Sequence, residues 1–146
     1  MTDKINLIKV ISEAKEKLDP SIISSFLPFT KETGIVFLLK KNYFYAKLVF
    51  SEQHIGNPIT KVLHGGVIAA LLQNTAQFHV LWEENMHKIP EIIDISINFL
   101  RLGKGEDTYA RASIIKNGKR VLNVEVKAWN DDENSPIANA SINFLV

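Results

Sequence analysis

The chain has 146 residues, of which 46% are apolar and 23% charged, so it is long enough for one globular domain with its own core. Lys and Arg total 17 against 16 Asp and Glu, a net charge of +1; this argues against a protein that coats nucleic acid, because such binding needs many cations on one face. The absence of cysteine excludes a disulfide framework, a thiolate nucleophile and a cysteine-based zinc site.

Residues 1–19 mix acidic and basic side chains and have no continuous apolar core, so they do not resemble a signal peptide. The longest unbroken apolar run in the most apolar stretch is six residues, Val67 to Leu72, whereas a membrane span needs about 18. A chain without disulfides also fits a reducing compartment. We therefore expect a cytoplasmic protein without a membrane span.

In the N-terminal half, residues 3–18 predict an amphipathic helix that ends before Pro20, since the residue before a proline avoids the helical region. Residues 21–26 predict a short helical turn. Residues 34–39 and 43–51 predict two strands, with a core-facing set on the second strand. That set comprises Phe44, Ala46, Leu48 and Phe50. Residues 52–61 are expected to form a loop.

A helix is predicted from about residue 65 to residue 84, with apolar side chains on nearly all sides, which is typical of a helix buried in the middle of a protein. Four strands are expected after it, arranged as a meander. Ile93, Ile95, Ile97 and Phe99 alternate with polar residues, and Asn117-Gly118 is a strong hairpin signal. The prediction is a single α+β domain over residues 1–146, an antiparallel sheet around one long helix, whose sheet edges favour subunit pairing.

The chemistry-bearing segment is His64-Gly65-Gly66, where the loop becomes this helix. The first amide N–H groups of a helix lack internal partners and have partial positive charge. Glycines allow a ligand to approach these amides, which can then polarise a carbonyl group or hold a developing oxyanion. His64 could orient the loop or a ligand, or act as a general base. The alternative is that the glycines only permit close packing and that His64 bonds to the backbone.

His64-Gly65-Gly66 followed by Val67 to Leu72 resembles the signature of hotdog-fold thioesterases, specifically the phenylacetate-pathway (PaaI-like) branch. Further matches are the strands of residues 34–50, the loop Asn57-Pro58-Ile59, the strand of residues 94–102 and the basic hairpin of residues 116–120. The resemblance implies a sheet wrapped around one buried helix, here with an extra N-terminal helix. It also implies a homodimer or a dimer of dimers that hydrolyses acyl-CoA to free acid and CoA at subunit interfaces, without metal or cofactor.

The resemblance also implies roles for individual residues. His64 orients the loop, Gly65 contacts the substrate, and the Gly66 N–H holds the thioester carbonyl oxygen. Asn57 resembles an asparagine that lines the site, although it stands seven residues before His64 where six is usual. Asn74 is expected to contact the substrate as well.

Basic residues are concentrated in residues 101–127, with seven basic against three acidic side chains and all three arginines. Arginine is well suited to binding phosphate. The residues expected to anchor the CoA phosphates are Arg101, Lys119 and Arg120. The alternative is a set of solvated strand faces and hairpin ends.

The serious departure from the family pattern is Gln73, which stands where active relatives usually have Asp or Glu. An amide cannot take a proton from water, and Glu83 and Glu84 lie about 15 Å further along the helix. We expect a thioesterase, weak for this reason, in which Gln73 and Asn57 hold a water molecule. The alternatives are a non-catalytic acyl-CoA or lipid-binding protein, or a hydratase or dehydratase of acyl thioesters.

The remaining histidines and tryptophans suggest structural roles. His54, His79 and His87 show no metal-ligand spacing, and we predict that His79 is a satisfied core or interface residue. Trp82 and Trp129 are predicted to be core or interface residues too.

Overall fold

The computed structural model describes residues 2–146 and begins with three helices, α1 (Thr2–Lys17), α2 (Ser21–Phe26) and α3 (Pro28–Thr33). The first two are the predicted helix and helical turn. The third was not predicted, although Pro28 at its first turn and Gly34 after its end are typical helix boundaries. Gly34 has φ +84°, and its N–H donates to the Thr30 carbonyl at 2.9 Å. The first strand therefore begins one residue later than predicted.

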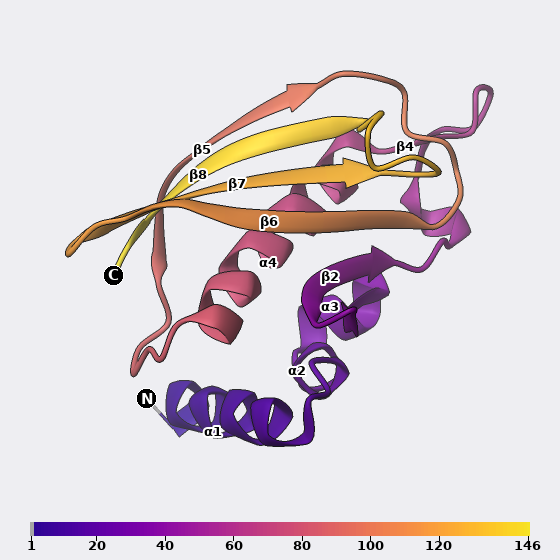
Figure 1. Cartoon of the computed structure of the whole chain (residues 1–146). Coiled ribbons are helices and arrows are strands. Elements are labelled where there is room, and N and C mark those ends of the chain that lie inside the picture. Colours follow the sequence, from indigo (N-terminus) through magenta and orange to yellow (C-terminus); the bar gives the residue numbers. More distant parts are fainter. Residues whose placement is uncertain (1) are drawn as a thin grey trace.

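Six strands form one antiparallel sheet in the order β1-β2-β6-β7-β8-β5 (Figure 1). Their bounds are Ile35–Lys40 (β1), Tyr43–Leu48 (β2), Glu91–Phe99 (β5), Thr108–Asn117 (β6), Val121–Trp129 (β7) and Ala138–Leu145 (β8). The prediction of a four-strand meander is wrong for β5, which pairs with β8 at the far edge and not with β6. Residues 100–107 cross the end of the sheet, which a meander turn would not do (Figure 1).

Strand β5 has a bulge that changes the predicted alternation. Ile92 lies opposite Phe144 and Asp94 opposite Asn143, so Ile93 is an extra, unpaired residue. Beyond the bulge, Ile95, Ile97 and Phe99 lie opposite three buried residues of β8 and so share the inner face of the sheet. Those partners are Ile142, Ala140 and Ala138. The other edge of β5 pairs with no strand of the described chain.

Helix α4 (Gly65–Glu83) lies across the inner face of the sheet (Figure 1). Its buried residues pack into the core; they are Ile68, Leu71, Leu72, Thr75, Ala76, Phe78, Val80 and Leu81. The prediction of burial on all sides is wrong, since Gln73 is exposed and Ala69, Ala70 and Gln77 are only half-buried. A sheet covers one side of a helix, so a stripe of α4 remains open. No helix within residues 2–146 is long and apolar enough to cross a membrane.

The predicted loop before α4 contains ordered structure. A 3-10 turn (η1, Glu52–His54) leads into a small two-stranded sheet, β3 (Ile55–Asn57) and β4 (Val62–Leu63). His54 is buried: its Nδ1 accepts from the Ser51 N–H at 3.1 Å, and its Nε2 lies 2.7 Å from the Thr33 carbonyl oxygen. The His54 carbonyl accepts the His64 N–H at 2.8 Å. These bonds fix the backbone from which α4 starts.

Candidate functional site

The start of α4 has one free amide. His64 is the N-cap, and its Nδ1 accepts from the Gly66 N–H at 2.9 Å. The N–H groups of Val67 and Ile68 both donate to the His64 carbonyl, at 3.0 and 3.2 Å. Among the hydrogen bonds of the described residues, none involves the Gly65 N–H. The amide to which the sequence assigned the thioester carbonyl, Gly66, is therefore already bonded, whereas Gly65 has the free donor.

The two glycines are needed for different reasons. A Cβ added to Gly66 would lie 2.9 Å from His64 Nδ1, closer than real Cβ contacts, so a side chain there would displace the capping ring. A Cβ added to Gly65 would lie 3.5 Å from Cζ of Phe99, which is ordinary van der Waals contact. Gly66 thus permits the cap, and Gly65 leaves its own amide open to a ligand.

The cap also restricts what the His64 ring can do. An imidazole nitrogen that accepts a hydrogen bond is unprotonated, so we assign the proton of the neutral ring to Nε2. In this state one nitrogen is bonded to Gly66 and the other is a donor, so neither is free to take a proton from water. The geometry supports the orienting role of His64 over the general-base role.

Asn57 lies beside this motif. The Cβ position of Gly56, its neighbour in β3, is only 2.8 Å from Cα of His64, so β3 packs directly against the motif. The Asn57 Oδ1 accepts from the N–H of Ile59 at 3.0 Å and of Thr60 at 3.4 Å. The side-chain oxygen is thus used to hold the turn, and the Nδ2 amide remains as the group that can face a ligand.

Gln73 lies on the open stripe of α4, seven residues and about 10.5 Å beyond Gly66. Seven residues are nearly two turns, so the two positions share one side of the helix. Asn74 is tied back to the helix, since its Nδ2 donates to the Ala70 carbonyl at 2.8 Å. Gln77, one turn beyond Gln73, donates to the Pro90 carbonyl at 3.0 Å, which ties the segment before β5 to α4.

The structure separates the predicted phosphate anchors. Arg101 follows β5 and donates to the Pro136 carbonyl at 2.9 Å. It lies near the start of α4, since Gly103, two residues further along the chain, packs against Ile68 of that helix. Lys119 and Arg120 lie in the β6–β7 turn. That turn sits at the other end of α4, where Asn117 donates to Glu84 at 3.1 Å, about 27 Å along the helix. One chain therefore brings only Arg101 to the His64 end.

Most other cations of the basic region are paired. Lys104 contacts Asp131 at 2.9 Å, and Glu133 lies 3.1 Å from Arg111 and 3.6 Å from Lys127. The hydrogen bond from Lys104 lowers the pKa of Asp131 below its usual value. None of the ion pairs within residues 2–146 includes the three predicted anchors. The acidic turn after β7 thus neutralises much of the basic region, and the anchors stay available.

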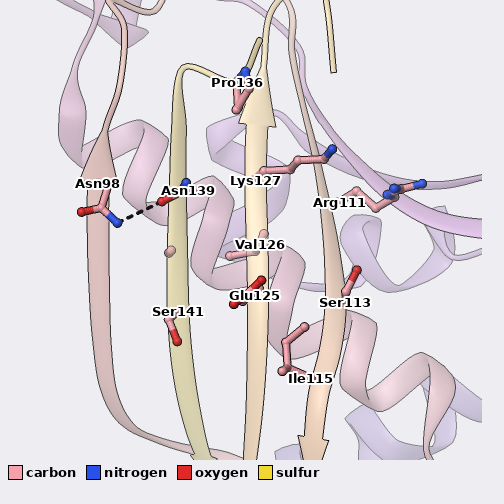
Figure 2. Close-up of a pocket in the computed structure, with 11 residues that line it drawn as sticks. Asn98, Arg111, Ser113, Ile115, Glu125, Val126, Lys127, Pro136, Asn139 and Ser141 are labelled. Carbon is pink, nitrogen blue, oxygen red and sulfur yellow. Dashed lines mark hydrogen bonds between the residues drawn. The ribbon is translucent and has the colours of Figure 1, made fainter. Parts of the chain in front are cut away.

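Among the cavities in the described part of the chain, two lie against the main sheet and away from the His64 motif. One, of about 460 Å³, lies on the outer face of the sheet, where Asn98 donates to Asn139 at 3.0 Å (Figure 2). The other, of about 570 Å³, opens where β2 separates from β6, whose pairing ends at Ala46 and Ala110. Neither cavity is lined by His64, Gly65, Gly66 or Gln73.

The second cavity is lined in part by His79. Burial, with the Arg111 guanidinium nearby, lowers the pKa of His79 to about 4. Its Nδ1 is buried and has no hydrogen-bond partner among the described residues. The prediction that His79 is a satisfied residue is therefore wrong. The described chain contains no group of three His, Asp or Glu side chains placed to hold a metal ion.

Comparison with known proteins defines the class to which the chain belongs. Residues 54–145 match the family described as the acyl-CoA thioesterase N-terminal domain. This match covers most of the chain, and the chain belongs to that family. The match begins at the buried His54 and includes the His64 motif, α4 and strands β5 to β8.

Among individual relatives, the chain is similar to the medium/long-chain acyl-CoA thioesterase YigI. The identity is 27% to the Salmonella typhimurium protein and 28% to the Escherichia coli protein, over 92% of this chain and 96% of each relative. A solved Chromobacterium violaceum protein is 28% identical over 94% of this chain and 96% of its own, with a TM-score of 0.78.

A phenylacetic acid degradation-related protein from Ralstonia eutropha has the same fold, at 18% identity and a TM-score of 0.75, over 94% of this chain and 99% of its own. A Bacillus halodurans protein solved with CoA also shares the fold, at 21% identity and a TM-score of 0.70, over 97% of this chain and 91% of its own. The α+β hotdog fold and the thioesterase resemblance predicted from the sequence are thereby confirmed.

Proposed function

We propose that the chain, acting as one domain over residues 1–146, hydrolyses acyl-CoA thioesters to the free acid and CoA. The observation on which this rests is the free Gly65 N–H at the start of α4, between the capping His64 and the open stripe with Gln73. Family membership supports the reaction, and the YigI relatives support medium or long acyl chains as substrates. Arg101 is the CoA anchor that this chain offers near the motif.

In the proposed reaction the thioester carbonyl oxygen accepts the Gly65 N–H, which stabilises the negative charge that develops on it. Gln73, through its side-chain carbonyl, and Asn57, through Nδ2, hold the attacking water. Neither amide takes the proton, which leaves through solvent as the CoA thiolate departs. The missing general base costs about 10²–10⁴ in rate, so we expect slow turnover.

We propose that the site is completed by a second copy of the chain. Strand β5 is an edge strand of the sheet within the described residues, and its Ile93, Ile95 and Phe99 are exposed. An exposed apolar edge strand is a template for pairing with another chain, and two-fold pairing is the commonest closed symmetry. In such a dimer, Lys119 and Arg120 of one copy would lie close enough to the His64 motif of the other copy to contact a CoA bound there.

The second candidate function is binding of acyl-CoA without hydrolysis. Gln73 favours it, because the open stripe of α4 contains no carboxylate before Glu83 at its last turn. In this candidate the Gly65 amide and the apolar stripe are retained as a binding pocket. The two functions predict different results for an acid at position 73: it should increase hydrolysis if the chain is a thioesterase and leave hydrolysis absent if the chain only binds acyl-CoA.

The test measures thiol release from acyl-CoAs of increasing chain length, for the natural chain and for Gln73→Asp. We expect slow release from the natural chain and a kcat about 10²-fold higher for Gln73→Asp. Gln53→Asp, which places the same acid at an exposed residue outside α4, is the matched control and should leave kcat unchanged. Binding of acyl-CoA without release by either chain would favour the binding protein, and absence of both would refute the proposal.

A further inference from the structure

Phe99 is an exposed aromatic residue beside the free amide. It ends β5 on the inner face of the sheet, opposite the fully buried Ala138. Its Cζ and Cε1 lie 3.5 and 3.6 Å from the position that a Cβ of Gly65 would take. Nevertheless 56% of its surface is exposed. The ring thus covers one side of the Gly65 backbone without being part of the core.

We propose that Phe99 forms the wall of the acyl pocket next to the Gly65 N–H and selects acyl groups by their bulk at the α carbon; this inference rests on the proposed function. A carbonyl oxygen bonded to the Gly65 N–H lies about 2.9 Å from that nitrogen. The α carbon of the acyl group is two bonds from this oxygen. It can therefore approach the Phe99 ring, which lies 3.5 Å from the position that a Cβ of Gly65 would take.

The chemistry of the ring determines the selection. Phe99 has no hydrogen-bonding group, so it neither competes for the amide nor holds water beside it. A methylene chain can lie along the flat ring, whereas an α-methyl branch would press into it. A difference of one methylene in an apolar pocket changes specificity by about 10- to 200-fold. Phe99 is therefore expected to favour straight-chain acyl groups over α-branched ones.

A purely structural role for Phe99 is poorly supported by its surroundings. More than half of the residue's surface is exposed, and its cross-strand partner Ala138 is small. The aromatic contacts of the core involve other residues, namely Phe37, Phe44 and Phe78, with ring centroids 5.1–5.2 Å apart. Removing the ring should leave the fold intact.

The experiment uses Phe99→Ala and the control Ile115→Ala, a residue equally exposed at 56% but on the outer face of β6. The probes are two acyl-CoA ketones in which a methylene replaces the thioester sulfur, one straight-chain and one α-methyl-branched. Neither can be hydrolysed, so their affinities are measured by calorimetry whether or not the protein is a catalyst. Thermal melting confirms that each variant is folded.

We expect the natural chain to prefer the straight-chain ketone and Phe99→Ala to reduce this preference at least about tenfold, while Ile115→Ala retains it. An unchanged preference in folded Phe99→Ala, an equal change in Ile115→Ala, or no binding of either ketone by the natural chain would overturn the inference. Failure of the proposed function appears separately, as ketone binding without thiol release from the corresponding thioesters. In that case the selection by Phe99 would still be measured.

Discussion

His79 makes the stability of the protein depend on pH. It lies in the cleft between β2 and β6 with Phe44, Glu83 and Arg111, and its ring meets that of Phe44 edge-on at 6.0 Å. Burial first, and Arg111 second, lower the pKa of His79 from 6.5 to about 4. The folded chain therefore holds this histidine neutral at pH values where the unfolded chain protonates it. The contribution of the neutral His79 to stability is fully present above pH 6.5 and is lost as the pH falls toward 4.

The size of the effect follows from the two pKa values. Between pH 7.5 and pH 5.5 the unfolded chain gains nearly one proton at His79 and the folded chain almost none, which lowers the free energy of unfolding by about 1 kcal/mol. His79→Leu removes this contribution. The difference in pH dependence between the natural chain and the variant thus isolates it from all other titrating groups.

The assay is urea unfolding at pH 7.5 and 5.5 for the natural chain, for His79→Leu and for His87→Leu. His87 is an exposed histidine after α4, and its variant controls for loss of a histidine elsewhere. The natural chain should lose about 1 kcal/mol more than His79→Leu over this range, and His87→Leu should behave like the natural chain. Equal losses in the natural chain and His79→Leu would refute the reasoning.

The other predictions concern the motif, the core and the paired cations. Gly65→Ala should lower kcat without loss of stability, whereas Gly66→Ala should weaken the cap by about 1 kcal/mol; steady-state kinetics and thermal melts check both, and identical effects would contradict the separate roles. Leu71→Ala, at a fully buried residue, should lower the free energy of unfolding by about 2–5 kcal/mol in urea titrations. Glu133→Gln should cost about 1 kcal/mol or less, and less in high salt, because the pairs are partly exposed.

Much of the secondary structure follows from local patterns. The helical spacing of residues 3–18, the apolar run of α4 and the turn at Asn117-Gly118 each determine an element whose bounds agree within a residue or two. These signals are local because helix and hairpin hydrogen bonds join neighbouring residues. The His64 motif was recognisable for the same reason, since N-caps and helix starts involve only a few consecutive residues.

The tertiary structure decided what depends on distant residues. The pairing of β5 with β8, the bulge at Ile93 and the neutralisation of Arg111 by Glu133 all join segments far apart in the sequence. Which glycine amide is free depended on the rotamer of His64, which the sequence pattern does not contain. The sequence by itself thus determined the longer elements, the motif and the family resemblance, whereas the exposed stripe of α4 and the approach of Phe99 to Gly65 were decided only by how the sheet closes over one side of the helix.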